Sequence, residues 1–184
     1  MPSETWGHRP VIPALFFVEI QQVLRERKTM AESVYSIVDV RKYYGGLEEA
    51  VRYIHGKWGR PENLDFYRDA IEHYGTQLPR FFLLLAGNRI SGCGALIAND
   101  FISRHDLWPW YACHFIEPAE RGRGLGQKLL NHGVRLAAEL GFRHVYLTTG
   151  HDGYYEKYGW ERIEDGFEPS GARTRIYRYS LQCI

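Results

Sequence analysis

A glycine-rich, basic turn between an apolar segment and a helical pattern is the stretch best suited to chemistry. The apolar segment ends near Ile116, the turn runs from Arg121 to Gly126, and apolar residues at helical spacing follow over residues 125–140. Glycines remove side chains that would keep a ligand from the backbone, and the first N–H groups of a helix have no partner inside it. The stretch therefore predicts an anion site that suits a phosphate.

The spacing of the glycines excludes two common nucleotide loops. A P-loop needs G-x-x-x-x-G-K-[ST], which the chain lacks. A dinucleotide fingerprint needs G-x-G-x-x-G in the first strand-to-helix turn, whereas here the third glycine comes one residue early and deep in the chain. The pattern present, Arg121-x-x-Gly124-x-Gly126, resembles the pyrophosphate loop of the GNAT superfamily of acyl-CoA-dependent N-acetyltransferases. A second stretch, Gly153-Tyr-Tyr-Glu-Lys-Tyr-Gly-Trp160, looks like the late F-Y-E-K-x-G-F segment of that family, and the resemblance covers about residues 36–182.

The resemblance implies acetyl-CoA as co-substrate and no metal. In the family, the strand before the loop pairs with the pantetheine arm, and a bulge in it, which maps to about residues 114–116, frees a backbone N–H that polarises the thioester carbonyl. The residues expected to contact acetyl-CoA are His114, Phe115, Ile116, Arg121, Gly122, Arg123, Gly124, Leu125, Gly126 and Gln127.

The same resemblance assigns the leaving group to a tyrosine. Tyr155 matches the general acid of the family, and Tyr154 lies at the preceding aromatic position. A phenol with a pKa near 10 that gives its proton to a thiolate near 8.5 works uphill by about 2 kcal/mol, which a strengthening hydrogen bond can offset.

The sequence points less clearly to the general base, the group that takes a proton from the amine. Histone-type members carry a glutamate on the strand before the loop, and Trp110 occupies the matching position here. His114 on that strand is the catalytic candidate. His105, Asp106 and His151 are alternatives, as is substrate taken up already uncharged. His105 and Asp106 lack a third ligand at a known spacing, so we expect no metal there.

The resemblance implies that the segment joining the first two helices covers the acceptor site, and residues at the mouth of the sheet are further candidates. Trp58, Asp106 and Trp110 are the candidate substrate residues, with Glu62 and Asp65 as weaker ones. The acids could equally belong to a solvated helix face.

Composition bounds the remaining classes. The chain has 184 residues, 45% of them hydrophobic, and a net charge of +1 from 23 basic and 22 acidic side chains. This near-neutral charge does not indicate binding to nucleic acid. No apolar run reaches the length of about 20 residues that a membrane span requires. The three cysteines are Cys93, Cys113 and Cys183, an odd, widely spaced set that predicts a reducing compartment. We expect a cytoplasmic protein without a signal peptide.

The periodicity predicts one mixed α/β domain over residues 34–184. A strand at 34–40 precedes a helix that ends at Gly56 and a second helix that begins at Pro61. Strands at 81–86 and 92–98 form a hairpin through Gly87-Asn88, and the helix 125–140 leads to a parallel strand at 142–148. A short helix at 152–158 and an antiparallel pair at 160–164 and 174–181 complete the pattern.

Residues 1–33 lie outside the resemblance. Phe16, Ile20 and Val23 would share one stripe of a helix, which predicts an amphipathic arm that packs on the domain or on a second subunit in a homodimer. Translation from Met30 is the alternative.

Three functions are compatible with these patterns. The leading one is an N-acetyltransferase that acts on a primary amine of a small molecule or peptide by direct attack in a ternary complex. The second acetylates a protein lysine or N-terminus, and the third is a non-catalytic acyl-CoA-binding regulatory module.

Overall fold

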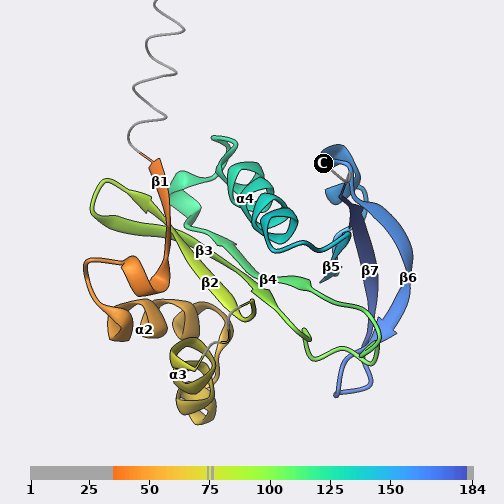
Figure 1. The fold of residues 1–184 in the computed structure, drawn as a ribbon, viewed down its shortest axis with the longest axis horizontal. Coiled ribbons are helices and arrows are strands. Elements are labelled where there is room, and N and C mark those ends of the chain that lie inside the picture. Colours follow the sequence, from red (N-terminus) through yellow and green to blue (C-terminus); the bar gives the residue numbers. More distant parts are fainter. Residues whose placement is uncertain (1–34, 74, 76, 182–184) are drawn as a thin grey trace, which may run out of the picture. The chain divides into compact units, whose positions relative to one another are not determined.

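The computed structural model describes residues 35–73, 75 and 77–181 (Figure 1). Residues 36–184 cluster as one compact unit. The predicted arm at residues 1–33 lies outside the described residues. Within the described part, no helix has both the length and the apolar character that a membrane crossing needs.

The domain is a seven-stranded mixed sheet flanked by helices, as the sequence predicted (Figure 1). The strands lie in the order β1-β2-β3-β4-β5-β7-β6. The strands are β1 (Tyr35–Asp39), β2 (Arg80–Ala86), β3 (Arg89–Ile97), β4 (Trp110–Ile116), β5 (His144–Thr149), β6 (Glu161–Phe167) and β7 (Arg173–Ser180). The α-helices are α2 (Leu47–Trp58), α3 (Leu64–Glu72) and α4 (Leu125–Glu139), with 3-10 turns η1 (Val40–Lys42), η2 (Pro61–Asn63), η3 (Pro118–Glu120) and η4 (Tyr155–Tyr158).

The β2–β3 hairpin is buried on both faces. It turns at Gly87-Asn88, which confirms the predicted turn, and Gly87 has a φ of +58° that favours glycine. Alternate β2 residues such as Leu83 join Val51 and Ile54 of α2 and Ile71 of α3 in one core cluster. On the opposite face Phe82 lies near α4, so α2 and α3 cover one side of the sheet and α4 the other, as Figure 1 shows.

Several predicted boundaries were wrong. Strand β3 begins at Arg89 rather than at residue 92, the short helix begins at Tyr155 rather than at residue 152, and β6 ends at Phe167 rather than at residue 164. The prediction that Gly56 ends the first helix fails, because α2 continues through it to Trp58 and the backbone N–H of Gly59 then donates to the carbonyl of His55. A glycine inside a helix costs only about 1 kcal/mol, which the buried face of α2 outweighs. The parallel strand after α4 begins at His144 rather than at residue 142.

The sheet divides between β4 and β5. These strands are parallel, as predicted, but the register among the described residues contains one pair, Trp110 with Tyr146. The backbone N–H of Tyr146 also donates to the carbonyl of Pro109 at 2.9 Å. Helix α4 packs closely beside this junction: a Cβ on its Gly133 would lie 2.4 Å from the Tyr111 ring. Beyond Trp110 the facing edges of β4 and β5 are therefore open to a ligand.

Candidate functional site

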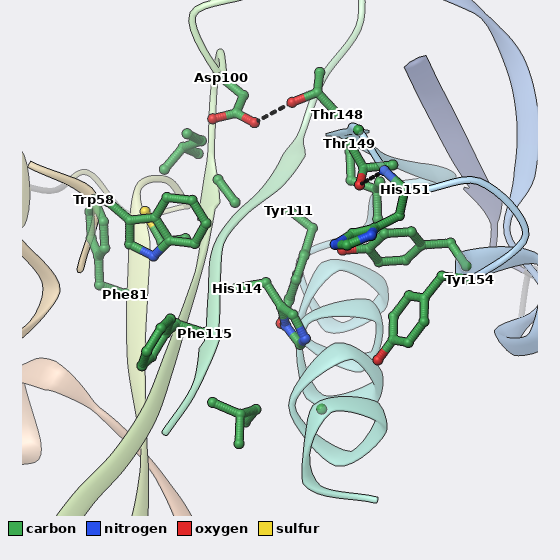
Figure 2. A pocket seen from close by; sticks show the side chains of 18 of the residues that line it. Trp58, Phe81, Asp100, Tyr111, His114, Phe115, Thr148, Thr149, His151 and Tyr154 are labelled. Atoms are coloured by element: carbon green, nitrogen blue, oxygen red, sulfur yellow. Dashed lines mark hydrogen bonds between the residues drawn. The ribbon is translucent and has the colours of Figure 1, made fainter. Parts of the chain in front are cut away.

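One cavity of about 1250 Å³ follows the division of the sheet. Its walls come from the end of α2, from Phe66, Tyr67 and Ala70 of α3, and from the end of β3 and most of β4. The glycine loop with the start of α4, the end of β5, and η4 complete them. Figure 2 shows Trp58 and Phe115 on one side and His151 and Tyr154 on the other, with Tyr111 and His114 between them. The cavity thus joins the predicted phosphate loop to a region of aromatic side chains.

The glycine loop forms the predicted cradle. Gly122 and Gly124 have φ values of +78° and +73°, and Gly124 is the N-cap of α4. The first hydrogen bond of α4 runs from the N–H of Lys128 to the carbonyl of Gly124, so the N–H groups of residues 125–127 precede any carbonyl of the helix. A Cβ at Gly126 would face the cavity, 3.4 Å from both His114 Nε2 and the Tyr154 hydroxyl. This geometry fits a pyrophosphate.

The two arginines of the loop have different surroundings. Arg121 lines the cavity, and its Nε donates to the carbonyl of Ile116 at 3.0 Å, which ties the loop to the end of β4. Arg123, which the sequence predicted as a cofactor contact, is not among the lining residues. Its guanidinium pairs with buried Glu120 at 3.1 Å. Apart from Arg123, every residue predicted to contact acetyl-CoA lines the cavity.

Strand β4 carries a bulge, one residue earlier than predicted. Cys93 pairs with Phe115 and Ala95 with Ala112, so the two residues Cys113 and His114 oppose Gly94 alone. Cys113 has a φ of +54°, a conformation that costs a non-glycine residue about 1–2 kcal/mol. Such a bulge leaves a backbone group without its ladder partner and re-aims the neighbouring side chain toward the cavity.

His114 is a neutral imidazole at neutral pH. Burial lowers its pKa to about 4, because the charged form would lose its hydration. Its Nδ1 and the Tyr111 hydroxyl share a hydrogen bond of 2.7 Å. Nε2 faces the start of α4, as the contact distance to a Cβ at Gly126 shows.

Tyr155 and Tyr154 both line the cavity. The Tyr155 ring is buried against Trp160 and Tyr177, with ring centroids 6.2 and 5.9 Å apart. Burial raises the pKa of Tyr155 to about 12, with a smaller contribution from Tyr154, while a hydrogen bond with Thr149 lowers it. Proton transfer to a thiolate near 8.5 then works uphill by roughly 3.5 units, or about 5 kcal/mol, more than the sequence-based figure.

Of the predicted substrate residues, the structure brings only Trp58 to the cavity. Trp110 is fully buried, and its Nε1 donates to the carbonyl of Leu107 at 2.7 Å. Asp106 is exposed and paired with Arg104 at 2.6 Å, which lowers the pKa of its carboxyl to about 2. Both predictions were drawn from position in the chain, and the loop between β3 and β4 directs these side chains elsewhere.

Asp100 is a cavity residue that the sequence interpretation did not select. It lies three residues beyond the end of β3 at Ile97, is partly buried, and accepts a hydrogen bond from the Thr148 hydroxyl at 3.0 Å (Figure 2). Burial raises the pKa of Asp100 to about 6, despite the hydrogen bond from Thr148. The sequence signal that could have identified it is an acidic residue in the short turn after a long apolar strand, three residues beyond the end of that strand.

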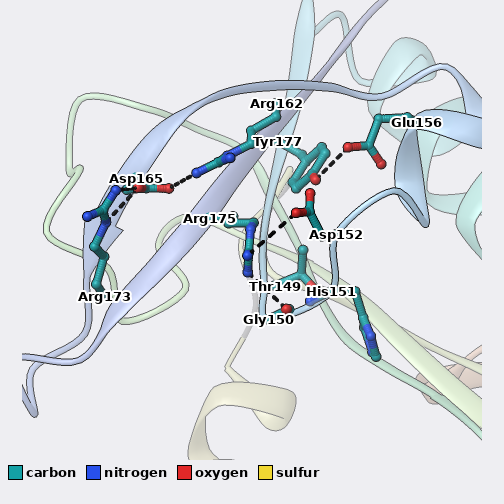
Figure 3. A network of polar contacts seen from close by, with 10 residues as sticks. All are labelled: Thr149, Gly150, His151, Asp152, Glu156, Arg162, Asp165, Arg173, Arg175 and Tyr177. Carbon is teal, nitrogen blue, oxygen red and sulfur yellow. Dashed lines mark hydrogen bonds and ion pairs between the residues drawn. The ribbon is translucent and has the colours of Figure 1, made fainter.

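A polar network holds the loop that carries His151 (Figure 3). Arg175 of β7 donates to the carbonyl of Gly150 at 3.0 Å and pairs with Asp152 at 3.7 Å. The N–H of His151 donates to the Thr149 hydroxyl at 3.0 Å. These contacts fix the end of β5 where His151 lines the cavity. Among residues 35–73, 75 and 77–181, no three His, Cys, Asp or Glu side chains converge in a way that could hold a metal ion.

Comparison with known proteins agrees with this geometry. The sequence matches the family described as acetyltransferase (GNAT) over residues 44–160. A search of curated proteins gives no match. Similar solved structures include a GNAT acetyltransferase from Staphylococcus aureus (20% identity, TM-score 0.57) and a putative one from Desulfovibrio desulfuricans (17%, 0.60). A third, from Elizabethkingia anophelis, contains bound acetyl-CoA (16%, 0.56). Each alignment covers 80% of this chain and 99% of the other. The chain therefore belongs to the GNAT family of acetyltransferases and is an acyltransferase.

Proposed function

We propose that the protein transfers the acetyl group of acetyl-CoA to a primary amine of a small molecule or peptide, by direct attack in a ternary complex. One observation carries the proposal: a single cavity connects the glycine loop, the open edge of β4 and an aromatic chamber beyond it. A donor held at the loop and an acceptor held in the chamber would meet at the bulge of β4.

The donor would be held mainly by backbone groups. The N–H groups at the start of α4 face the site of the pyrophosphate, and Arg121 adds a positive charge beside it. The open edge of β4 offers amide groups along an extended line, which suits the amides of pantetheine. The Elizabethkingia protein, which shares the fold, has acetyl-CoA bound and supports this choice of donor.

Direct attack is favoured because the thiols of the described residues are poor nucleophiles. Burial raises the pKa of Cys93 to about 12 and that of Cys113 well above its usual range. Neither would be a thiolate near pH 7, so neither is suited to form an acyl-enzyme. The acetyl group would then pass directly from sulfur to nitrogen.

Tyr155 and His114, which both line the cavity, are assigned different roles in proton transfer and hydrogen bonding. Tyr155 would donate to the leaving sulfur, with its hydrogen bond strengthening as charge develops. His114 lies at the loop, and with a pKa of about 4 it retains a proton poorly at neutral pH. We therefore assign it a hydrogen-bonding role near the donor and place the base elsewhere.

A free-thiol release assay tests the proposal. Purified protein with acetyl-CoA is offered small amines, amino acids, polyamines, aminoglycosides, and peptides with a free N-terminus or lysine. We expect thiol release that depends on the acceptor and a product heavier by one acetyl group. Acetylation of peptides alone would favour a protein acceptor, and acetyl-CoA binding with no turnover on any acceptor would contradict the catalytic proposal.

A further inference from the structure

The far end of the cavity is a chamber with aromatic walls, which we call the acceptor chamber. It is formed by Trp58, Phe66, Tyr67, Asp100, Phe101 and Thr148. Trp58, Phe66 and Phe101 are 48%, 50% and 57% exposed, which is unusual for large apolar side chains in one region. Phe66 and Phe101 contact each other at a centroid distance of 5.5 Å. These walls suit a flat apolar group.

The turn after β3 is built to hold two side chains in this chamber. The Asn99 side chain accepts a hydrogen bond from the N–H of Ile102 and donates one to the carbonyl of the same residue, both at 3.3 Å. Between them Phe101 adopts a φ of +49°, a conformation that costs a non-glycine residue about 1–3 kcal/mol. Ile102 is buried and anchors the turn. The fold thus maintains a strained turn that places Asp100 and Phe101 at the cavity.

The charge of the chamber is negative. Asp100 accepts a hydrogen bond from the Thr148 hydroxyl of β5. Its charge acts on the Tyr67 phenol of α3 and the Cys113 thiol of β4, and the Glu168 carboxylate of the β6–β7 turn acts on Asp100. Among the described residues that line the cavity, the sole Lys or Arg is Arg121, at the loop. An ammonium group would therefore be drawn to Asp100, and no cation of the described lining competes for it there.

We propose that the acceptor is a primary amine carried on a flat apolar group, and that the Asp100 carboxylate binds the ammonium and takes its proton. The inference rests on the function proposed above and names its substrate class and base. Trp58, Phe66 and Phe101 would enclose the apolar group. Thr148, which donates to the Asp100 carboxylate, is a positioning residue.

Asp100 and Tyr155 account for the proton transfers that accompany bond formation and bond cleavage in the acetyl transfer. Asp100 removes one proton from the ammonium, and the neutral nitrogen forms a bond to the thioester carbonyl carbon. The bond between that carbon and sulfur breaks, and the sulfur leaves with the electron pair and receives a proton from Tyr155. The acetylated nitrogen gives up its second proton to water. Asp100 and Tyr155 then return to their starting states through solvent.

A hydroxyl-rich acceptor fits the chamber less well. Its hydroxyl groups would lose water against Trp58, Phe66 and Phe101 without gaining hydrogen bonds, and unpaired polar groups oppose binding. The expected order of acceptors is therefore tryptamine and phenethylamine first, ethylamine next, and an aminoglycoside last.

The test compares Asp100→Asn with wild type on phenethylamine across pH 5–9. We expect kcat/KM of the wild type to include an ionisation near pH 6 and the variant to lose that ionisation, with a fall of about 100-fold at pH 7.5. Asp106→Asn, an exposed acid of the same loop outside the cavity, is the matched control and should keep the wild-type profile. Calorimetric acetyl-CoA affinity should be unchanged in both variants.

A variant of Thr148 distinguishes a positioning role from a merely structural one, because a structural role would not change the pH dependence of kcat/KM. Thr148→Val removes the donor that favours the charged carboxylate, so the ionisation of kcat/KM should shift to higher pH without disappearing. Trp58→Ala should lower kcat/KM at least tenfold for phenethylamine and leave that for ethylamine within about twofold.

An Asp100→Asn profile identical to wild type would overturn the inference, and so would ethylamine used as well as phenethylamine. If no amine is acetylated, phenethylamine binding to the CoA-loaded protein still tests the chamber, since it needs no turnover. Binding that Asp100→Asn weakens at least tenfold would support the chamber assignment while the catalytic proposal fails. Absence of binding in wild type would overturn it.

Discussion

The two ends of the cavity offer different kinds of groups to a ligand. The proposed donor end offers backbone N–H groups at Gly124 and the start of α4, in a loop with left-handed glycines. The proposed acceptor end offers side chains, chiefly Asp100, Trp58 and Phe101, on a turn and on the end of a helix. A backbone site is tied to a fixed glycine spacing, whereas a side-chain site can be rebuilt at any position that faces the cavity. On the proposed function, the donor end would therefore be constrained by its backbone, and the acceptor end by the particular side chains of this protein.

The donor end should be the more sensitive to a single change. Gly124→Glu forces a side chain into a backbone at φ +73° and puts a carboxylate where phosphate belongs, so we expect acetyl-CoA affinity to fall more than 100-fold by calorimetry. Gly141→Glu is the matched control, because Gly141 has a φ of +83° at the other end of α4 and lies outside the cavity lining. Comparable affinity loss in both variants would attribute the effect to folding.

The tyrosines between the two ends should separate binding from turnover. Tyr155→Phe is expected to lower kcat by roughly 10–100-fold with acetyl-CoA affinity nearly intact, because it removes the proton donor and keeps the ring. Tyr154→Phe should have a smaller effect, although its hydroxyl lies nearer to the loop. A larger loss in Tyr154→Phe would move the general acid to Tyr154.

The free energy of unfolding should depend on pH in opposite directions for His114 and Asp100, which lie at the two ends of the cavity. The pKa of His114 falls from 6.5 to about 4 on folding, so its contribution is present above pH 6.5 and is lost as pH falls toward 4. The pKa of Asp100 rises from 3.8 to about 6, so its contribution is present below 3.8 and is lost as pH rises through 6. Each group contributes at most about 3 kcal/mol to the pH dependence of the free energy of unfolding.

Urea unfolding from pH 4 to pH 7 measures these slopes. Relative to wild type, His114→Gln should gain stability as pH falls, and Asp100→Asn should gain stability as pH rises. Asp106→Asn should stay parallel to wild type over this range, since the pKa of Asp106 lies at about 2. Parallel curves for all three variants would contradict the assignment of both shifts.

The smallest expected effect concerns the support of the His151 loop. Arg175→Ala removes the contacts to Gly150 and Asp152, and we expect kcat to fall about two- to fivefold, as exposed ion pairs contribute little. Arg173→Ala is the control, because Arg173 lies two residues away on β7 and pairs with Asp165. Equal kcat values for both variants would exclude a positioning role for Arg175.

The sequence predicted the donor end far better than the acceptor end. Glycine spacing, a hairpin turn and helical periodicity are local signals, and they located the loop, β2–β3 and α4 to within about three residues. Trp110 and Asp106 were chosen by position in the chain, but which side chain faces a cavity depends on the path of the loop between β3 and β4. Asp100 was missed for the same reason, because its turn is defined by tertiary contacts with Thr148 and by the Asn99–Ile102 hydrogen bonds.

The single pair that joins β4 to β5 bears on how the fold is held together. The hydrogen-bond ladder of the sheet is interrupted after Trp110 and Tyr146, and α4 spans the interruption by packing. A donor that paired along the open edge of β4 would act as an additional strand and would add its binding free energy to the cohesion of the sheet. The resistance of this enzyme to unfolding would then rise and fall with the concentration of its own co-substrate.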